Sequence, residues 1–280
     1  MRYPITLSLS RRFDYYMQSF NQKQSTMYKV TPIPAFQDNY IWKISLGSKL
    51  ILVDPGDADV VLKQLNSDDE IVGILVTHYH RDHTGGIAAL KQEFPNIQVY
   101  GPSNSPYPNI DVKLNDQSQI YFEALNLSFN IITIPGHTLD HIAFYNQDWI
   151  FCGDTLFSAG CGRMFEGNPQ MFLDSIKKLT GLNQDAQLFC THEYTLANIE
   201  FALTIEANNQ DLIAYQKKVV DLRALNLPSL PSSIRLEKLI NPYLRCNSDA
   251  IKIKLSKLTR LEINSEVDAF ATIRQLKDDF

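Results

Sequence analysis

The chain is poor in cysteine, in long apolar runs and in excess positive charge, and each shortage excludes a class of protein. Its 280 residues include four cysteines and no CxxC pair, which excludes a disulfide-stapled scaffold and a cysteine-rich zinc module and favours a reducing compartment. No run approaches the ~18 apolar residues of a membrane-spanning helix. With 26 basic against 31 acidic side chains, a general nucleic-acid binder is excluded. We expect a folded, monomeric, cytoplasmic protein.

The first 26 residues differ in composition from the rest of the chain. They hold four basic side chains against one acidic one and show no clear periodicity. This composition is weakly typical of an organelle transit peptide, which would make the protein mitochondrial. The alternative is an over-extended start, because Met27 directly precedes the first strand-like segment. We expect residues 1–26 to be dispensable.

The remaining chain divides into two parts with different patterns. Residues 28–192 alternate short β-rich runs with turn residues and two helical stretches, expected at 57–66 and 86–94, which indicates a mixed α/β domain. After residue 193 the pattern becomes helical and is interrupted at prolines 228, 231 and 242. We predict a catalytic domain over residues 27–192 and a helical domain over residues 193–280.

All six histidines fall in three short segments, at residues 77–83, 135–141 and 191–193. The first segment directly follows an apolar strand, so its polar side chains lie on a loop at a strand end, where functional sites are common. Imidazole and carboxylate are ligands for zinc, iron or manganese. This segment contains four such side chains within six residues, His78, His80, Asp82 and His83.

The spacing of these side chains favours two metal ions rather than one. His78 and His80 are two residues apart and point the same way from an extended segment, whereas Asp82 and His83 lie beyond the bend. A carboxylate that bridges the two ions would complete the site, and Asp154 is the best candidate because it follows a strand and Gly153. Taken alone, a Gly-Asp-Thr sequence is more often a turn or a helix cap.

Together these motifs resemble the metallo-β-lactamase fold family and, within it, the hydroxyacylglutathione hydrolases, or glyoxalase II enzymes. The general resemblance rests on HxHxDH at 78–83, on VDPG at 53–56, and on Gly136-His137, Gly153-Asp154 and His192. The closer one rests on segments 33–42, 152–157, 160–167, 192–195 and 274–280. It implies an αββα sandwich, followed by an α-helical substrate-binding domain.

The resemblance also implies roles for individual residues. His78, His80 and His137 would hold one divalent metal, Asp82, His83 and His192 a second, and Asp154 would bridge them; zinc is expected, with iron or manganese as alternatives. Asp82 would also orient the attacking water, so that Asp82 and Asp154 are the catalytic residues. The implied reaction is hydrolysis of S-D-lactoylglutathione to D-lactate and glutathione, the second step of methylglyoxal detoxification. The residues implied to bind glutathione are Arg163, Phe165, Tyr194, Arg274 and Lys277.

Other interpretations remain open from the sequence. Arg274 and Lys277 lie on one helix face. Without the resemblance, they are interpreted as the solvated end of a helix, where cations favour the helix dipole. A glutathione persulfide dioxygenase of the same fold and a non-catalytic metal-binding protein are the alternative functions.

The chain also departs from the family pattern at one loop. Asp140 stands where GHTxGH has glycine, and it would adopt a left-handed turn or accept a hydrogen bond from a ligand histidine. His141, at the end of the same motif, is expected to form structural hydrogen bonds.

Overall fold

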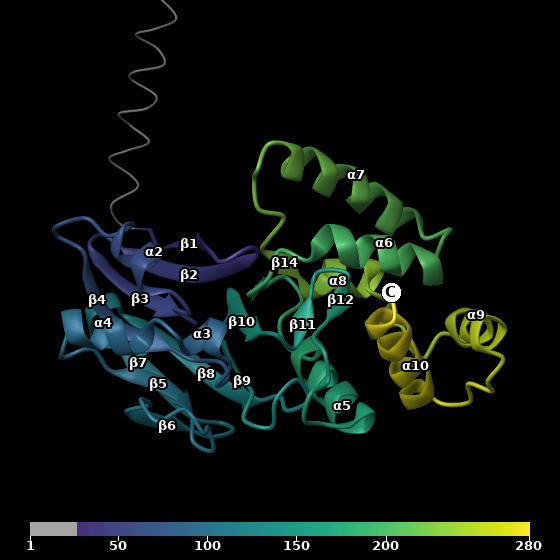
Figure 1. The fold of residues 1–280 in the computed structure, drawn as a ribbon, viewed down its shortest axis with the longest axis horizontal. Helices are drawn as coiled ribbons and strands as arrows, with labels where there is room; N and C mark the ends of the chain where they lie inside the picture. The colour runs from purple at the N-terminus through teal and green to yellow at the C-terminus, as the bar shows by residue number, and fades with distance from the viewer. Residues whose placement is uncertain (1–26) are drawn as a thin grey trace, which may run out of the picture.

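A computed structural model describes residues 27–280, and it contains two six-stranded sheets packed face to face (Figure 1). The first sheet has the order β1-β2-β3-β4-β5-β6. Its strands are β1 (Lys29–Ala35), β2 (Asn39–Leu46), β3 (Lys49–Val53), β4 (Glu70–Leu75), β5 (Val99–Pro102) and β6 (Val112–Leu114).

The second sheet has the order β14-β13-β10-β9-β8-β7. Its strands are β7 (Gln119–Phe122), β8 (Leu127–Thr133), β9 (Ile142–Tyr145), β10 (Trp149–Gly153), β13 (Gln187–Cys190) and β14 (Ser232–Ser233). The strands β11 (Leu156–Phe157) and β12 (Gly160–Cys161) form a separate hairpin. The short strand β14 comes from the helical part of the chain and pairs with β13, so the C-terminal part is tied to the sheet.

Alternation of apolar side chains explains why the first sheet is buried on both faces. In β3, Ile51 and Val53 point into the core between the sheets, whereas Leu50 and Leu52 point to the outer face. That outer face is covered by α2 (Ala58–Leu62), α3 (Arg81–Thr84) and α4 (Ile87–Glu93) (Figure 1). Successive side chains of a strand point to opposite faces, so the sheet lies between two hydrophobic cores.

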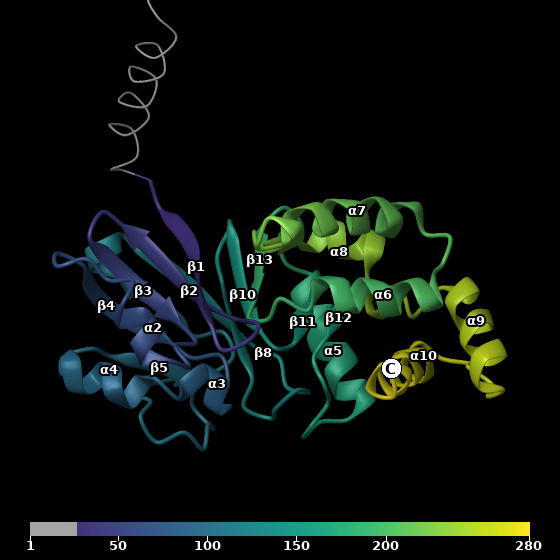
Figure 2. The ribbon, with the colours of Figure 1, turned by 45° about the horizontal axis from the view of Figure 1, so that its top comes forward.

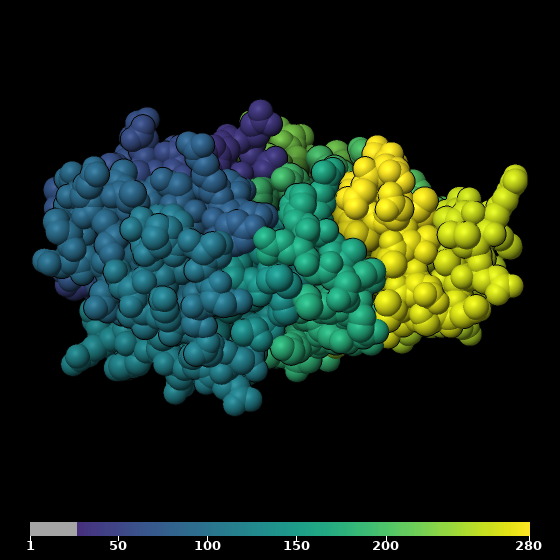
Figure 3. Space-filling model, turned by 60° about the horizontal axis from the view of Figure 1, so that its bottom comes forward, coloured from purple at the N-terminus to yellow at the C-terminus, as the bar shows by residue number. Residues whose placement is uncertain are grey.

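The second sheet is covered on its outer side by helices from residue 169 onward (Figure 2). These are α5 (Pro169–Thr180), α6 (Thr195–Ile205), α7 (Gln210–Ala224), α8 (Ile234–Ile240), α9 (Asp249–Thr259) and α10 (Glu266–Asp278), with the 3-10 turn η3 (Pro242–Leu244). A second 3-10 turn, η2 (Glu123–Leu125), connects β7 and β8. Phe172 of α5 and Phe270 of α10 belong to one buried cluster, which attaches α10 to the sandwich. The space-filling view in Figure 3 shows α10 in yellow against the teal part of the chain.

The predicted strands and helices are present, and both predicted helices of the first domain are shorter than expected. The helix expected at 57–66 ends at Leu62, because Asn66 and Asp69 form a hydrogen-bonded turn instead. The predicted change to helices after residue 193 is observed, and Ser265 begins α10 with a capping box to Asp268. The prediction for residues 1–26 lies outside the described residues. None of the helices within 27–280 is long and apolar enough to span a membrane.

The loops that carry the predicted ligands come together at one end of the sandwich. They follow the C-terminal ends of β4, β8, β10 and β13, and within the second sheet these strands run in the same direction. The hairpin between β1 and β2 joins them, because the backbone N–H of Glu193 donates to the carbonyl of Asp38. One end of the fold therefore gathers residues from five separate parts of the chain.

Candidate metal centre and substrate cavity

The predicted metal ligands form two compact groups. His78, His80 and His137 make up the three-histidine cluster, and Asp82, His83, Asp154 and His192 make up the mixed cluster. Within each group the potential ligand atoms lie within 4.8 Å of one another. The division between the groups is the one that the spacing of the first segment predicts.

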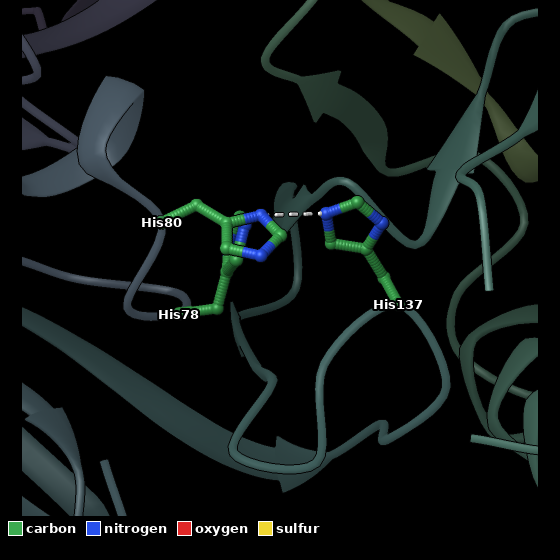
Figure 4. A group of neighbouring side chains, drawn as sticks. All are labelled: His78, His80 and His137. Carbon is green, nitrogen blue, oxygen red and sulfur yellow. Dashed lines mark hydrogen bonds between the residues drawn. The ribbon is translucent and has the colours of Figure 1, made fainter. Parts of the chain in front are cut away.

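A hydrogen bond to the backbone fixes the tautomer of His137 in the three-histidine cluster. His137 Nδ1 lies 2.8 Å from the carbonyl oxygen of Arg163, and since a carbonyl only accepts, Nδ1 carries the proton. His137 Nε2 therefore carries a lone pair, and it lies 3.0 Å from His80 Nδ1 (Figure 4). His78 Nε2 is buried and has no hydrogen-bond partner among the described residues. This donor set fits a cation.

Two carboxylates orient the histidines of the mixed cluster. Asp54 Oδ2 lies 3.0 Å from His83 Nδ1, and Asp38 Oδ1 lies 2.8 Å from His192 Nδ1. Because a carboxylate accepts the Nδ1 proton of each ring, each Nε2 points into the cluster. His83 Nε2 has no hydrogen-bond partner within residues 27–280, which again fits a metal ligand.

Asp154 lies between the two clusters. Its Oδ2 is 3.4 Å from His83 Nε2, 3.2 Å from His192 Nε2 and 3.5 Å from His137 Nε2. The backbone N–H of Asp154 donates to His141 Nε2 over 3.1 Å, while His141 Nδ1 lies 3.1 Å from the carbonyl of Ile142. The predicted structural role of His141 is confirmed, since it holds the backbone of Asp154.

The electrostatics of the two clusters differ. Burial lowers the pKa of His78 and of His137, which favours the neutral form of these two rings and leaves each with a lone pair for a metal. In the mixed cluster the carboxylates of Asp154 and Asp54 outweigh burial and raise the pKa of His83 to about 10, and Asp154 likewise raises the pKa of His192. The neighbouring histidines lower the pKa of Asp154 despite its burial. A cation that binds the mixed cluster must displace protons.

The structure corrects both expectations for Asp140. Asp140 is absent from the residues with positive φ, and its Oδ1 accepts a hydrogen bond from Thr138 Oγ1 over 2.7 Å rather than from a histidine. Its Oδ2 is buried without a hydrogen-bond partner among the described residues, and burial raises its pKa. Asp140 thus supports the turn that carries His137 and does not reach the metal ligands.

A cavity of about 710 Å³ opens beside the clusters. Its wall includes His80, Asp82, His137, Asp154 and His192 from the two clusters. All five residues predicted to bind glutathione also line it, namely Arg163, Phe165, Tyr194, Arg274 and Lys277. The structure therefore brings five of the seven predicted metal ligands and all the predicted glutathione-binding residues to the wall of one cavity.

The two predicted cations of α10 have different environments. Arg274 is only 5% exposed, and its Nη1 donates to the carbonyl of Cys161 over 2.8 Å, so it braces the loop after β12. Lys277 is half-buried, its Nζ donates to the carbonyl of Ala197 over 3.1 Å and lies 5.0 Å from the centre of the Phe280 ring. The interpretation of the pair as a solvated helix end is wrong for Arg274.

The aromatic residues of the cavity pack on the clusters. The Tyr194 ring stacks on the His192 ring with 4.6 Å between centroids and 5° between planes. Phe165 meets the rings of His80 and His137 edge to face, at 5.7 Å and 5.2 Å. These contacts connect the substrate wall directly to the candidate metal ligands.

Sequence reasoning missed several residues that support the site. Asp54 and Asp38 orient ligand histidines, and Asn39 Nδ2 donates to Asp82 Oδ2 over 2.9 Å. All three lie within segments that carry the family resemblance, at 53–56 and 33–42. Membership of those segments is the sequence signal by which they could have been found. Phe280 also lines the cavity.

Comparison with known proteins identifies the family. Residues 39–192 match the model of the metallo-beta-lactamase superfamily, and residues 193–280 match the hydroxyacylglutathione hydrolase C-terminus. A hydroxyacylglutathione hydrolase of Nitrosomonas eutropha is 44% identical over 255 residues, which are 91% of this chain and 100% of that protein. A protein of the same name from Shewanella loihica is 47% identical over 259 residues, with the same coverage of both chains.

Solved structures show the same fold at lower identity. The crystal structure of ETHE1 from Myxococcus xanthus is 20% identical with a TM-score of 0.58, and it covers 88% of this chain and 100% of that one. A metallo-beta-lactamase from Staphylococcus aureus is 18% identical with a TM-score of 0.56, covering 91% and 72%. The likeness to these structures establishes the αββα fold, and the sequence matches establish that the chain belongs to the hydroxyacylglutathione hydrolase family.

Proposed function

We propose that the protein hydrolyses S-2-hydroxyacylglutathione thioesters, with S-D-lactoylglutathione as the reference substrate, to a 2-hydroxy acid and glutathione. The observation that supports the proposal is the shared cavity, whose wall includes residues of both candidate metal clusters and the cations Arg163, Arg274 and Lys277. An anionic glutathione moiety held by the cations puts its thioester next to the clusters. The names of the relatives support the same activity.

We assign the metal ligands by the two clusters. His78, His80 and His137 would hold one divalent cation, and Asp82, His83 and His192 the other, with Asp154 shared between them. Zinc is the proposed metal, and the nitrogen and oxygen ligands also suit iron or manganese. The chemistry that such a pair of cations supplies when bound is a hydroxide nucleophile at neutral pH and Lewis-acid stabilisation of the oxyanion.

The protein residues position the reactants around that chemistry. The neighbouring His192 and His83 lower the pKa of Asp82 despite its partial burial, so its carboxylate is ionised and can accept a hydrogen bond from the attacking water. The ring of Tyr194, stacked on His192, and the edge of Phe165, next to His137, line the cavity at the clusters and give the substrate an apolar contact there. The leaving group is a thiol with a pKa of ~8.5, so it departs as a thiolate without a general acid.

A comparison of three substrates tests this proposal. We expect steady-state hydrolysis of S-D-lactoylglutathione, and a much lower kcat/KM for a D-lactoyl thioester of a simple neutral thiol, which the cations do not recognise. Asp154→Ala should abolish turnover, while the exposed Asp68→Ala should not. Oxygen consumption on glutathione persulfide without thioester hydrolysis would instead establish the dioxygenase. Neither reaction, with the metals bound, would indicate a non-catalytic metal-binding protein. The cytoplasmic location and the monomeric state remain predictions.

A further inference from the structure

The charges that line the cavity include one anion outside the two clusters. Arg163, Arg274 and Lys277 contribute three positive charges, and Asp278 contributes a carboxylate among them. Asp82 and Asp154 are the other carboxylates of the cavity wall, and both belong to the mixed cluster. The part of the wall that faces a glutathione moiety therefore carries both signs of charge.

The contacts of Asp278 use one of its two oxygens. Oδ1 lies 3.1 Å from Arg274 Nη2 and 3.4 Å from Arg163 Nε. No hydrogen bond to Oδ2 occurs within residues 27–280, and the side chain is 35% exposed while that of Arg274 is 6% exposed. The side chain of Asp278 thus lines the cavity, is partly exposed and keeps one oxygen without a hydrogen bond among the described residues, while its other oxygen contacts two arginines.

Helix stability does not explain a carboxylate at this position. Asp278 is the last residue of α10, where the helix dipole disfavours negative charge. In its ion pair with Arg274 the cation lies four residues N-terminal to the anion. This order stabilises a helix less than the reverse order, with the anion first. The carboxylate is held at the cavity wall by its contacts with Arg274 and Arg163, and not by any benefit to the helix end.

The charges of glutathione complement this arrangement. The tripeptide carries two carboxylates and one α-ammonium group, and its sulfur forms the thioester that must reach the clusters. The three cations suit the two carboxylates, and the ammonium group requires an anion or a set of acceptors. Resting on the proposed function, we propose that Asp278 binds the α-ammonium group of the γ-glutamyl residue and so selects glutathione thioesters over thioesters whose amine is blocked.

The experiment compares S-D-lactoylglutathione with its N-acetyl derivative, in which the ammonium is a neutral amide. The enzymes are the wild type, Asp278→Asn and Asp279→Asn, the last being a matched control because Asp279 is exposed and pairs with Gln275. Thermal unfolding of each variant confirms that it is folded.

We expect acetylation to raise the KM of the wild type and of Asp279→Asn about tenfold, with a smaller effect on kcat. Asp278→Asn should raise the KM for the unmodified substrate by a similar factor. In this variant, acetylation of the substrate should raise the KM little further. If Asp278 only positions the two arginines, Asp278→Asn will raise both KM values by the same factor, and the proposal is wrong. A wild type that does not discriminate between the substrates would also overturn it.

Binding measurements separate this inference from the proposed function. Titration calorimetry of glutathione and N-acetylglutathione into the metal-loaded wild type and Asp278→Asn needs no turnover. If the wild type hydrolyses neither thioester, the proposed function fails. The role of Asp278 would still be supported if the wild type binds glutathione more tightly than N-acetylglutathione and Asp278→Asn does not. Equal binding of both ligands by the wild type would refute that role.

Discussion

Asp54 Oδ2 lies 3.0 Å from His83 Nδ1, and both side chains are buried. Asp54 also accepts hydrogen bonds from the backbone N–H and the hydroxyl of Thr77, at 2.8 Å and 2.7 Å. One buried carboxylate thus fixes the ring of His83 and the start of the loop that carries His78 and His80. The turn at residues 53–56 is therefore part of the candidate metal centre.

The first prediction concerns this carboxylate. Asp54→Asn keeps the shape but weakens the acceptor for His83 Nδ1, and we expect metal affinity to fall by ~10- to 100-fold. Competition with a chromophoric chelator measures the affinity, with the exposed Asp59→Asn as a control. An unchanged affinity in Asp54→Asn would contradict the orienting role.

The second prediction concerns pH and the metal-free protein. The pKa of His83 is raised to about 10 in the fold, above the ~6.5 of an unfolded histidine. A raised pKa adds stability that is complete below pH ~6.5 and is lost as the pH rises toward 10. The thermal midpoint of the chelator-treated protein should fall over this range, whereas that of the metal-loaded protein should fall less because the cation replaces the proton. A metal-free midpoint that rises with pH would refute this account.

The third prediction separates the two cations of α10. Lys277→Ala should raise the KM for S-D-lactoylglutathione about tenfold and leave the thermal midpoint nearly unchanged. Arg274→Ala should raise KM and also lower the midpoint, because the carbonyl of Cys161 and the carboxylate of Asp278 lose their donor. Equal midpoints for both variants would show that Arg274 does not brace the loop.

The fourth prediction concerns a buried carboxyl group that belongs to neither cluster. Glu237 is fully buried, accepts from Ser158 Oγ and the backbone N–H of Ala159 at 2.9 Å and 2.8 Å, and bonds Ser232 and Asn241. Glu237→Ala leaves these buried donors without an acceptor, and we expect the free energy of unfolding to fall by about 3 kcal/mol. Urea unfolding at fixed metal concentration measures it, with the exposed Glu262→Ala as the control. A loss below about 1 kcal/mol would contradict the prediction.

The sequence predicts the candidate metal ligands better than it predicts the residues that orient them. His78, His80, Asp82 and His83 are recognisable because a dense His/Asp motif follows an apolar strand, and the structure divides them between clusters as the spacing indicates. Asp38 and His192 are 154 positions apart, and their hydrogen bond depends on how the β1–β2 hairpin meets the end of β13. No local pattern contains that information.

The same limit explains the differences at Arg274 and Asp140. Helical spacing places Arg274 on a face of α10 but does not reveal that the loop after β12 packs over it and buries it. Asp140 stands where the family has glycine, but its backbone is not left-handed and its carboxylate accepts a hydrogen bond from Thr138. Burial and tertiary hydrogen bonds decide these roles.

The central claim is that the two clusters act together on one thioester. We would titrate the metal-free protein with Zn²⁺ and follow both bound metal and hydrolysis of S-D-lactoylglutathione, for the wild type and for Asp154→Ala. The account predicts that activity reaches its maximum near two metal ions per chain and falls at least ~100-fold in the variant. Full occupancy by two metal ions without hydrolysis in the wild type would contradict it.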